Sequence, residues 1–260
     1  MIDTHCHLTY PGLTERLDEV IEAAASAGVD RMVSIGTSAE DSRLAAAVAE
    51  RHPQVWATAG LHPHHAAAMR DAAELQEQLR ELLDRPRVVA LGEMGLDLHY
   101  DDPPLDVQRA AFGAQLELMI ERPDLPGVIH NREATEATLA MLKDLGLPGE
   151  RFLFHCFTGS PGEVDAILAT GAMVGFTGIT TFRSAANVAE ASDRVPLDRL
   201  LIETDSPYLT PEPHRKVRPN EPQYVRFVAG FLAERRGMTV DEFTTAVDAN
   251  AERFYRLPPK

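Results

Sequence analysis

The chain has 260 residues and a formal net charge of −15, and 44% of its residues are hydrophobic. This size suits two small domains or one α/β barrel, and because no linker divides the sequence we expect one domain over residues 1–260. The negative charge argues against a protein that coats nucleic acid through a broad basic face, although bound cations and a few arginines could still attract a phosphate into one cleft.

The first predicted element, a short strand at residues 2–8, carries three side chains that can bind metal. Successive side chains of a strand point to opposite faces, so Asp3, His5 and His7 are expected on one face. Two imidazoles on one edge can hold a divalent ion, but an isolated His-x-His pair is as often two ordinary histidines. The interpretation of this strand therefore depends on the rest of the chain.

Strand and helix patterns alternate through the remaining sequence. Apolar runs predict further strands at residues 30–35, 55–59, 88–92, 127–129, 151–154, 173–176 and 200–203. Helical spacing predicts helices at residues 13–28, 39–51, 72–84, 106–120, 134–145, 161–170, 185–192, 221–236 and 240–254. About eight strand and helix pairs at this length predict a single-domain α/β fold, a (β/α)8 TIM barrel with an extra C-terminal helix. A doubly wound open sheet is the alternative, but no G-x-G-x-x-G turn follows the first strand.

Chemically active side chains occur at the ends of many of these predicted strands. In a parallel barrel the carboxyl ends of the strands converge on one face, where catalytic residues come from different strands. His5 and His7 lie at the end of the first strand, and the other candidates follow later strands: His62, Glu93, His130, His155 and Asp205. We therefore expect residues that are distant in the sequence to meet at one end of the barrel.

This set of imidazoles and carboxylates is typical of a site for Zn, Mn, Fe or Mg. Four histidines and two carboxylates exceed what one tetrahedral ion needs, so two divalent ions that share a carboxylate fit better. Glu93, midway through the order of strands, is the expected bridge. Cys6 and Cys156 alternate with neighbouring histidines, so we expect them to point toward the helices as small buried hydrophobic residues.

Six blocks of the sequence resemble the signature of a known family. They are Asp3-Thr4-His5-Cys6-His7-Leu8, Gly60-Leu61-His62-Pro63, Gly92-Glu93-Met94-Gly95-Leu96-Asp97, His130-Asn131-Arg132, Phe154-His155-Cys156-Phe157-Thr158-Gly159 and Glu203-Thr204-Asp205-Ser206-Pro207-Tyr208. These blocks look like those of the TatD family of metal-dependent deoxyribonucleases. They occur in family order, and with Asn220-Glu221-Pro222 the resemblance covers nearly the whole chain.

The resemblance implies a two-metal TIM barrel similar to that of amidohydrolases. It implies one ion on His5, His7, Glu93 and Asp205, and a second ion on Glu93, His130 and His155. The chain departs from the family in the loop after Tyr208. The family usually has His-Arg-Gly-Lys before Asn-Glu-Pro, whereas this loop has no glycine and is one residue longer, running from His214 to Pro222.

Hydrolysis of a DNA phosphodiester is the primary hypothesis, by an exonuclease that acts on single-stranded or frayed ends. Two ions could activate a water, orient the scissile phosphate and stabilise the leaving oxygen. Glu93, Asp205 and His62 are the expected catalytic residues. Asp205 would bind metal and accept the proton of the water, and His62 would donate a hydrogen bond to the phosphate or the leaving group.

Substrate contacts are predicted for basic side chains near the strand ends, because a guanidinium group suits phosphate oxygens. The candidates are Arg132, Arg183, His214 and Arg215. A metal-dependent ester or amide hydrolase, such as an aminoacyl-tRNA deacylase, remains the alternative because metal-activated water attacks phosphorus and carbon alike. A non-catalytic metal-binding protein is disfavoured because Glu93 and Asp205 are both retained.

The sequence also predicts where the protein resides. No apolar run approaches the roughly 18 residues that cross a bilayer, and no charged and then apolar segment of the kind found in secretion signals opens the chain. Two cysteines exclude a disulfide framework. We therefore expect a cytoplasmic protein that does not associate with membranes, and no obligate protein partner is indicated.

Overall fold

The computed structural model describes residues 1–258, and in them eight parallel strands form one sheet in sequence order. The strands are β1 (Ile2–Cys6), β2 (Arg31–Ser34), β3 (Val55–Ala59), β4 (Val88–Asp97), β5 (Gly127–Arg132), β6 (Phe152–Phe154), β7 (Met173–Phe176) and β8 (Leu200–Ile202). Just past β8, Cys6 and Ser206 pair as a parallel bridge, and the Asp205 amide donates to the His5 carbonyl oxygen. The first and last strands therefore meet, and the sheet closes into the predicted (β/α)8 barrel.

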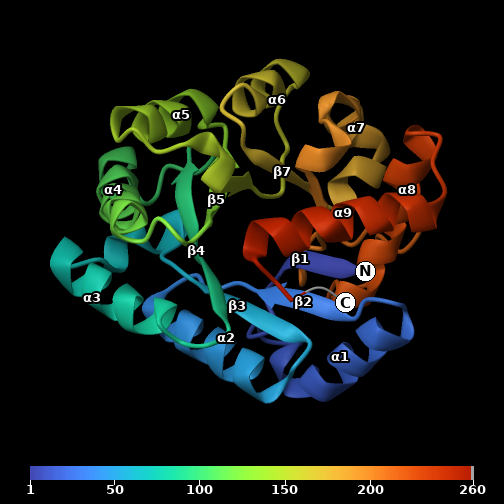
Figure 1. The fold of residues 1–260 in the computed structure, drawn as a ribbon, viewed down its shortest axis with the longest axis horizontal. Coiled ribbons are helices and arrows are strands. Elements are labelled where there is room, and N and C mark those ends of the chain that lie inside the picture. The colour runs from blue at the N-terminus through green and yellow to red at the C-terminus, as the bar shows by residue number, and fades with distance from the viewer. Residues whose placement is uncertain (259–260) are drawn as a thin grey trace.

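Helices surround the strands on the outside of the barrel (Figure 1). They are α1 (Leu17–Ser26), α2 (Ala39–Arg51), α3 (Ala72–Leu83), α4 (Leu105–Glu121), α5 (Thr135–Asp144), α6 (Pro161–Leu168), α7 (Ala186–Arg194), α8 (Val225–Arg235) and α9 (Val240–Tyr255). Short 3₁₀ helices occupy several connections. Among the described residues, no helix has the length and apolar character needed to cross a membrane.

Buried apolar side chains form two clusters, one on each side of the sheet. The larger cluster lies between the strands and the helices and includes Leu79, Phe112 and Phe243. The smaller cluster combines inward-facing side chains, such as Val33 and Leu201, with residues from the end of α9. Alternate residues of each strand thus supply two different cores, as expected for a barrel whose interior is filled.

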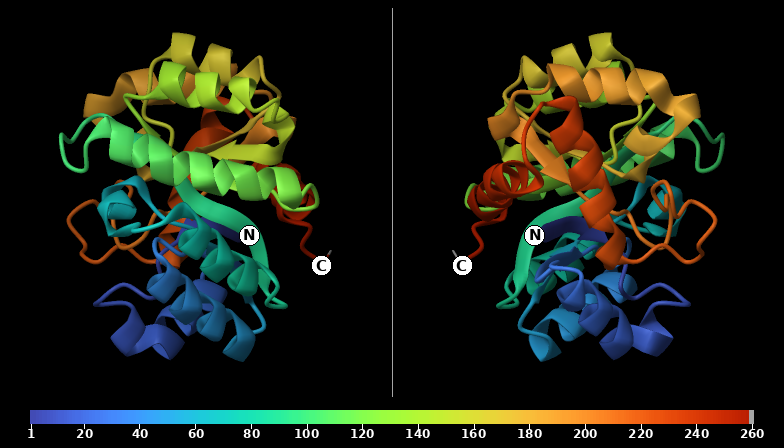
Figure 2. Two further views of the ribbon diagram at one scale, coloured as in Figure 1. Left: turned by 90° about the vertical axis from the view of Figure 1, so that its left-hand side faces the viewer. Right: turned by 90° about the vertical axis from the view of Figure 1, so that its right-hand side faces the viewer.

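Helix α9 closes the end of the barrel where the strands begin, and it crosses in front of the strands in Figure 1. The Tyr255 hydroxyl donates to the Thr4 carbonyl oxygen at 3.1 Å, and the Asn250 amide donates to the carbonyl oxygens of Leu197 and Leu200. The N-terminus and the end of α9 lie on this side of the molecule, opposite the loop at 203–221 (Figure 2). The other end of the barrel is therefore left to the loops that follow the strands.

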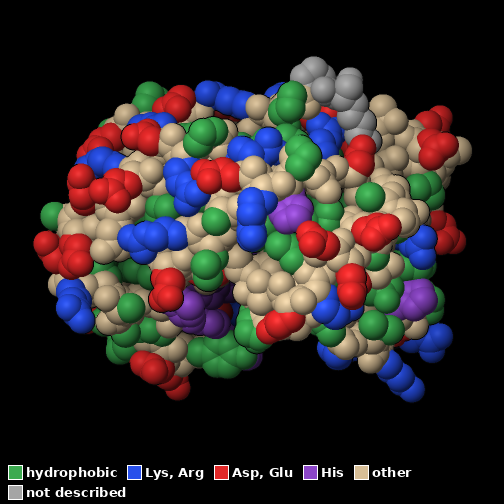
Figure 3. All heavy atoms as spheres, turned by 90° about the horizontal axis from the view of Figure 1, so that it is seen from below, with side chains coloured by type: hydrophobic (Ala, Val, Ile, Leu, Met, Phe, Trp, Pro, Cys, Tyr) green, Lys and Arg blue, Asp and Glu red, His purple; other side chains and the backbone are tan. Residues whose placement is uncertain are grey.

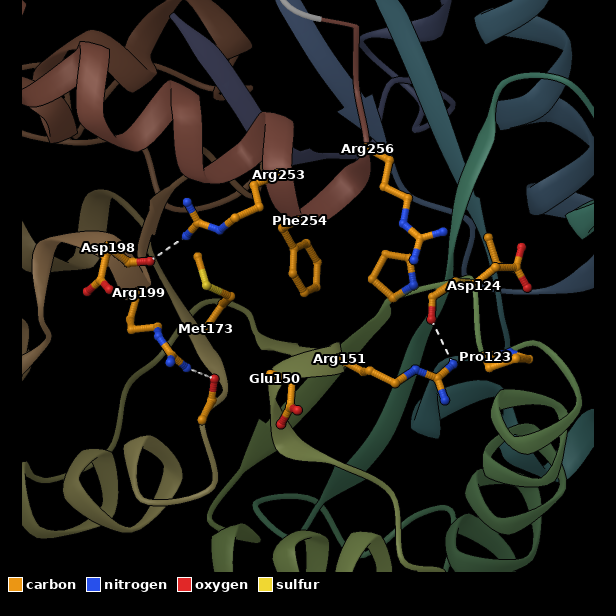
Figure 4. A pocket seen from close by; sticks show the side chains of 13 residues that line it. Pro123, Asp124, Glu150, Arg151, Met173, Asp198, Arg199, Arg253, Phe254 and Arg256 are labelled. Atoms are coloured by element: carbon orange, nitrogen blue, oxygen red, sulfur yellow. Dashed lines mark hydrogen bonds between the residues drawn. The ribbon is translucent and has the colours of Figure 1, made fainter.

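A hollow of about 400 Å³ lies beside α9, and three of the four arginines that line it contact backbone carbonyl groups. Arg151 donates to the carbonyl oxygens of Met119, Arg122 and Leu125 at 2.6–2.8 Å. Arg199 donates to the Gly171 carbonyl oxygen and Arg253 to the Asp198 carbonyl oxygen (Figure 4). These arginines satisfy backbone acceptors left free at the ends of helices and strands.

The predicted elements are all present, and the differences lie at their ends. Strand β4 continues to Asp97 and β5 to Arg132, so Glu93 and His130 lie within strands rather than after them. The first strand ends at Cys6 instead of residue 8. The predicted helices at 13–28 and 221–236 begin as 3₁₀ turns, at Thr14–Arg16 and Pro222–Tyr224. Polar residues at these ends stay in the ladder because a neighbouring strand supplies backbone partners.

The prediction for the two cysteines is confirmed for Cys6 and wrong for Cys156. Cys6 is fully buried in the larger core. Cys156 is half-buried, and its sulfur lies 3.7 Å from the Thr177 hydroxyl instead of among the helices. Its φ of 43° ends the extended conformation directly after β6, so the strand alternation that the prediction assumed does not reach it.

Candidate metal centre

Histidine and carboxylate side chains from six strands converge at the end of the barrel opposite α9. Histidine side chains gather in a recess at the lower edge of the surface in Figure 3, next to hydrophobic side chains. The innermost members are almost completely buried: His5, Glu93 and His155 have exposed fractions of 0%, 2% and 4%. The expected meeting of residues distant in the sequence is thus present in the structure.

The first group of side chains surrounds one oxygen of Glu93. The Nε2 atoms of His5 and His7 lie 3.3 Å apart, and they lie 3.5 and 4.0 Å from Glu93 Oε2. Asp205 Oδ1 lies 3.6 Å from His5 Nε2 and 3.2 Å from His7 Nε2. Asp205 has a φ of 50°, a left-handed conformation that aspartate tolerates better than most residues.

The second group surrounds the other oxygen of Glu93. His155 Nε2 lies 2.7 Å from Oε1, and His130 Nδ1 lies 2.9 Å from the same oxygen. Glycine at position 95 permits this approach of β4 to β5, because a Cβ there would collide with the His130 carbonyl oxygen and the φ of Gly95 is 143°. Glu93 thus presents one carboxylate oxygen to each group.

The charge of Glu93 is stabilised by its neighbours. Burial by itself would raise the pKa of Glu93, but His155, His62 and His130 hold that pKa well below its usual value. Burial likewise opposes the charged form of His155, yet the Glu93 carboxylate raises the pKa of that histidine well above its usual value. A buried carboxylate among imidazoles is the electrostatic setting that a cation can share.

Two further carboxylates lie beside the second ring nitrogens of the histidines, and neither was among the predicted site residues. Asp97 Oδ2 lies 2.9 Å from His130 Nε2, which leaves Nδ1 of that ring free to face Glu93. Glu203 Oε1 lies 3.5 Å from His155 Nδ1, on the far side of the ring from Glu93, but this nitrogen makes no hydrogen bond among the described residues. A carboxylate hydrogen-bonded to the second nitrogen fixes the tautomer of a ligating histidine, and Asp97 is placed to do this for His130. Both residues stand inside the quoted sequence blocks, which was the available signal.

Buried aspartate also holds the last strand in place. Asp3, expected beside His5 and His7, is fully buried and accepts hydrogen bonds from the amide and hydroxyl of Thr204. Burial raises the pKa of Asp3 to about 8, against the effect of these bonds. Asp3 therefore joins β1 to the segment that carries Asp205, instead of facing the two groups of histidines.

His62 presents a proton toward the centre. Its Nδ1 accepts the His64 amide at 3.1 Å, so the neutral ring carries its hydrogen on Nε2. That nitrogen lies 3.3 Å from Glu93 Oε1 and 3.1 Å from His130 Nδ1. Burial lowers the pKa of His62 to about 4, which keeps the ring neutral near pH 7. The geometry fits a hydrogen-bond donor at the edge of the second group.

The four predicted substrate contacts have different surroundings. Arg132 is half-buried, with its guanidinium 5.2 Å from the centre of the Tyr100 ring. Arg183 is exposed, and Arg215 is exposed over the Phe182 ring at 4.0 Å. His214 packs against the rings of Tyr224 and Phe227, with ring centres at 5.3 and 4.6 Å. Arg132 thus contacts Tyr100, whose ring lies beside His64, while His214 packs against α8.

The donor set fits divalent metal. The ligand atoms of His5, His7 and Glu93, all in the first group, lie within 4.8 Å of one another, and so do those of Glu93 and His130 of the second group with the neighbouring His62. Imidazole nitrogen and carboxylate oxygen suit zinc and other first-row metals. His5 Nδ1 is buried without a hydrogen-bond partner among the described residues, so Nε2 is the nitrogen of this ring that faces the other ligands.

Comparison with known proteins agrees with this chemistry. The family described as TatD related DNase matches residues 2–256. The protein YabD of Bacillus subtilis, named an uncharacterized metal-dependent hydrolase, is 39% identical over 261 residues, which cover 99% of both chains. A protein of Erwinia billingiae named 3'-5' ssDNA/RNA exonuclease TatD is 37% identical over 265 residues, which cover 99% of this chain and 100% of the relative.

A solved structure extends the agreement to three dimensions. The crystal structure of YjjV, a TatD homologue from Escherichia coli, superposes with a TM-score of 0.92 at 32% identity and covers 99% of this chain and 98% of that one. The fold, the buried histidines and carboxylates and these relatives all lead to the same assignment. The chain belongs to the TatD family and is a metal-dependent hydrolase that acts on ester bonds.

Proposed function

We propose that the protein is a two-metal exonuclease that removes nucleotides from single-stranded or frayed ends of DNA. The observation that carries the proposal is the division of the two Glu93 oxygens between two groups of ligands. A carboxylate that bridges two ions would have this arrangement, and two neighbouring ions suit an in-line attack on a phosphate. The relative from Erwinia billingiae, named as a 3'-5' exonuclease, supports attack from the 3' end.

The ligands divide into two sets that share Glu93. His5, His7 and Asp205 would hold one divalent ion with Glu93 Oε2, and His130 and His155 would hold the other with Glu93 Oε1. Ions bound there supply Lewis acidity and lower the pKa of a water molecule. Zn, Mn, Mg and Fe are all compatible with nitrogen and oxygen donors of this kind.

Asp205 and His62 are the side chains that would move or hold a proton. Asp205 is the more accessible of the two carboxylates in the centre, with 14% of its side chain exposed against 2% for Glu93. It can therefore accept a proton from an attacking water at the mouth. His62 directs its Nε2 hydrogen into the same space, where it could stabilise a phosphate oxygen or the leaving group.

Selection for ends follows from the charge of the molecule. A net charge of −15 repels a long duplex, whereas a single strand can enter a recess where cations and Arg132 reverse the local field. Arg183 and Arg215 are further candidate contacts on the surface. Because few phosphates would be engaged at once, salt should weaken the activity only modestly.

A comparison of substrates tests the proposal. The metal-loaded protein is incubated at two salt concentrations with linear single-stranded DNA, linear duplex and closed circular DNA, with the label at either the 5' or the 3' end. We expect release of mononucleotides from the 3' end of single strands. An RNA strand and an acyl ester, the substrate type of an aminoacyl-tRNA deacylase, are run in parallel. Rapid nicking of the circle, or turnover of the ester alone, would contradict the proposal.

A further inference from the structure

Three tyrosine rings stand in the open around the metal centre. Tyr10, Tyr100 and Tyr208 have exposed fractions of 41%, 49% and 47%, although large hydrophobic side chains are usually covered. Each lies in a loop that follows a strand, after β1, β4 and β8. Their exposure therefore coincides with the end of the barrel that carries the two groups of ligands.

The rings flank the two groups of ligands on two sides. Tyr208 lies beside His7 of the first group, with ring centres 6.4 Å apart, and Tyr10 lies against Tyr208 at 5.5 Å. Tyr100 lies beside His64 at 5.4 Å, and His64 in turn lies 5.9 Å from His130 of the second group. A phosphate held between the two groups would thus have an exposed aromatic ring on either side.

The surroundings of Tyr100 favour a base over a phosphate. A hollow of about 540 Å³ is lined by His64, Tyr100, Asp101 and Asp102. Two aspartates repel a phosphate but can accept hydrogen bonds from the N–H groups of a base. The guanidinium of Arg132 lies 5.2 Å from the Tyr100 ring and steadies it from one side.

We infer that Tyr100 and the pair Tyr10 and Tyr208 are stacking platforms for unpaired nucleobases on the two sides of the scissile phosphate. The inference rests on the proposed nuclease function and gives it a structural basis for choosing single strands. Base faces inside a duplex are covered by neighbouring base pairs, whereas an unpaired base can present its face to an aromatic ring. Stacking tolerates any sequence because every base has such a face.

Binding separates this inference from cleavage. In an Asp205→Asn background, the affinity for a fluorescent six-nucleotide single strand is measured by anisotropy, together with strands that carry one abasic residue at each position in turn. We expect Tyr100→Ala and Tyr208→Ala each to weaken binding of the intact strand by about 5- to 150-fold. Each variant should cause no further loss of affinity for the strand in which the abasic site removes the base that stacks on that tyrosine. Tyr→Phe at either position should bind within about twofold, because the ring remains.

Controls make the outcome decisive. Leu44→Ala removes an equally exposed apolar side chain from α2 and should change nothing. Metal content and thermal unfolding are measured for each variant. The inference is overturned if the alanine variants weaken the binding of intact and abasic strands equally, or weaken the binding of neither. Cleavage of the intact strand by the wild type is measured separately. If the strand is cleaved but the tyrosine variants weaken binding of intact and abasic strands equally, the stacking inference alone is wrong. If the variants weaken only the binding of strands that carry the matching base but the strand is not cleaved, the nuclease function alone is wrong.

Discussion

The two ends of the barrel use buried charge in opposite ways. At the end where strands begin, arginines donate to backbone carbonyl oxygens, as Arg151 does to three of them. Arg199 and Arg253 likewise donate to the carbonyl oxygens of Gly171 and Asp198 (Figure 4). At the other end, Glu93 is surrounded by the nitrogens of five histidines, and these groups face one another instead of the backbone.

The difference separates stability from chemistry. Carbonyl groups at the end of α4 lack partners within the helix, and a cation there also complements the helix dipole. Such contacts need nothing from outside. A buried carboxylate surrounded by imidazoles is fully stabilised only when a cation binds among them. This end of the barrel therefore serves to bind a ligand rather than to stabilise the fold. Variants at the two ends should therefore be distinguishable by the property that they lose.

The largest effect is expected for Glu93→Ala. Removing this carboxylate leaves both groups of ligands incomplete, so both ions and nearly all activity should be lost. Metal analysis of the purified variant and its rate on single-stranded DNA are the measurements. Glu81→Ala, at an exposed position of α3, is the matched control and should retain both properties. Two full equivalents of metal in Glu93→Ala would exclude the bridging role.

Asp205→Asn should lower turnover by about 100- to 10,000-fold while much of the metal remains. The amide keeps an oxygen that can coordinate, but it cannot accept a proton. Turnover at saturating substrate is compared with metal content in the same preparation. A loss below about tenfold would mean that another group takes the proton.

Asp97→Asn should have a smaller effect, of about 10- to 100-fold in metal affinity or activity. The amide presents hydrogens where His130 and His64 now find a carboxylate oxygen 2.9 Å away. His130 would lose its preferred tautomer without losing its ligand atom. Metal titration followed by a rate measurement at saturating metal tests this. Unchanged metal affinity together with an unchanged rate would remove Asp97 from the site.

The smallest effect on catalysis, and a clear one on stability, is expected for Arg151→Ala. Loss of its donors leaves buried carbonyl groups unsatisfied, which should lower the free energy of unfolding by about 1–3 kcal/mol. The turnover of the folded variant should stay within about twofold of the wild type. Urea unfolding and the rate of DNA hydrolysis are the measurements, and Arg151→Lys should be intermediate in stability. A folded variant with low turnover would show that the two ends are not independent.

Local patterns in the sequence were sufficient for the framework. The spacing of apolar residues predicts each strand and helix, because burial on one or two faces imposes a period on the chain. The sequence also indicates that seven side chains near the carboxyl ends of strands belong together, although Glu93 and His130 lie within their strands, and the structure brings these side chains together: His5, His7, His62, Glu93, His130, His155 and Asp205. The family resemblance adds the division of metal ligands, which stays a proposal.

Tertiary structure decided the contacts that depend on register and on chain direction after each strand. Asp97 reaches His130 because β4 continues alongside β5, with Gly95 opposite His130. Cys156 leaves the strand alternation because its φ is positive. The three exposed tyrosines come from separate loops, and nothing in their local sequence indicates that they surround one centre. Periodicity describes one segment at a time, whereas these contacts join segments that only the closed barrel brings together.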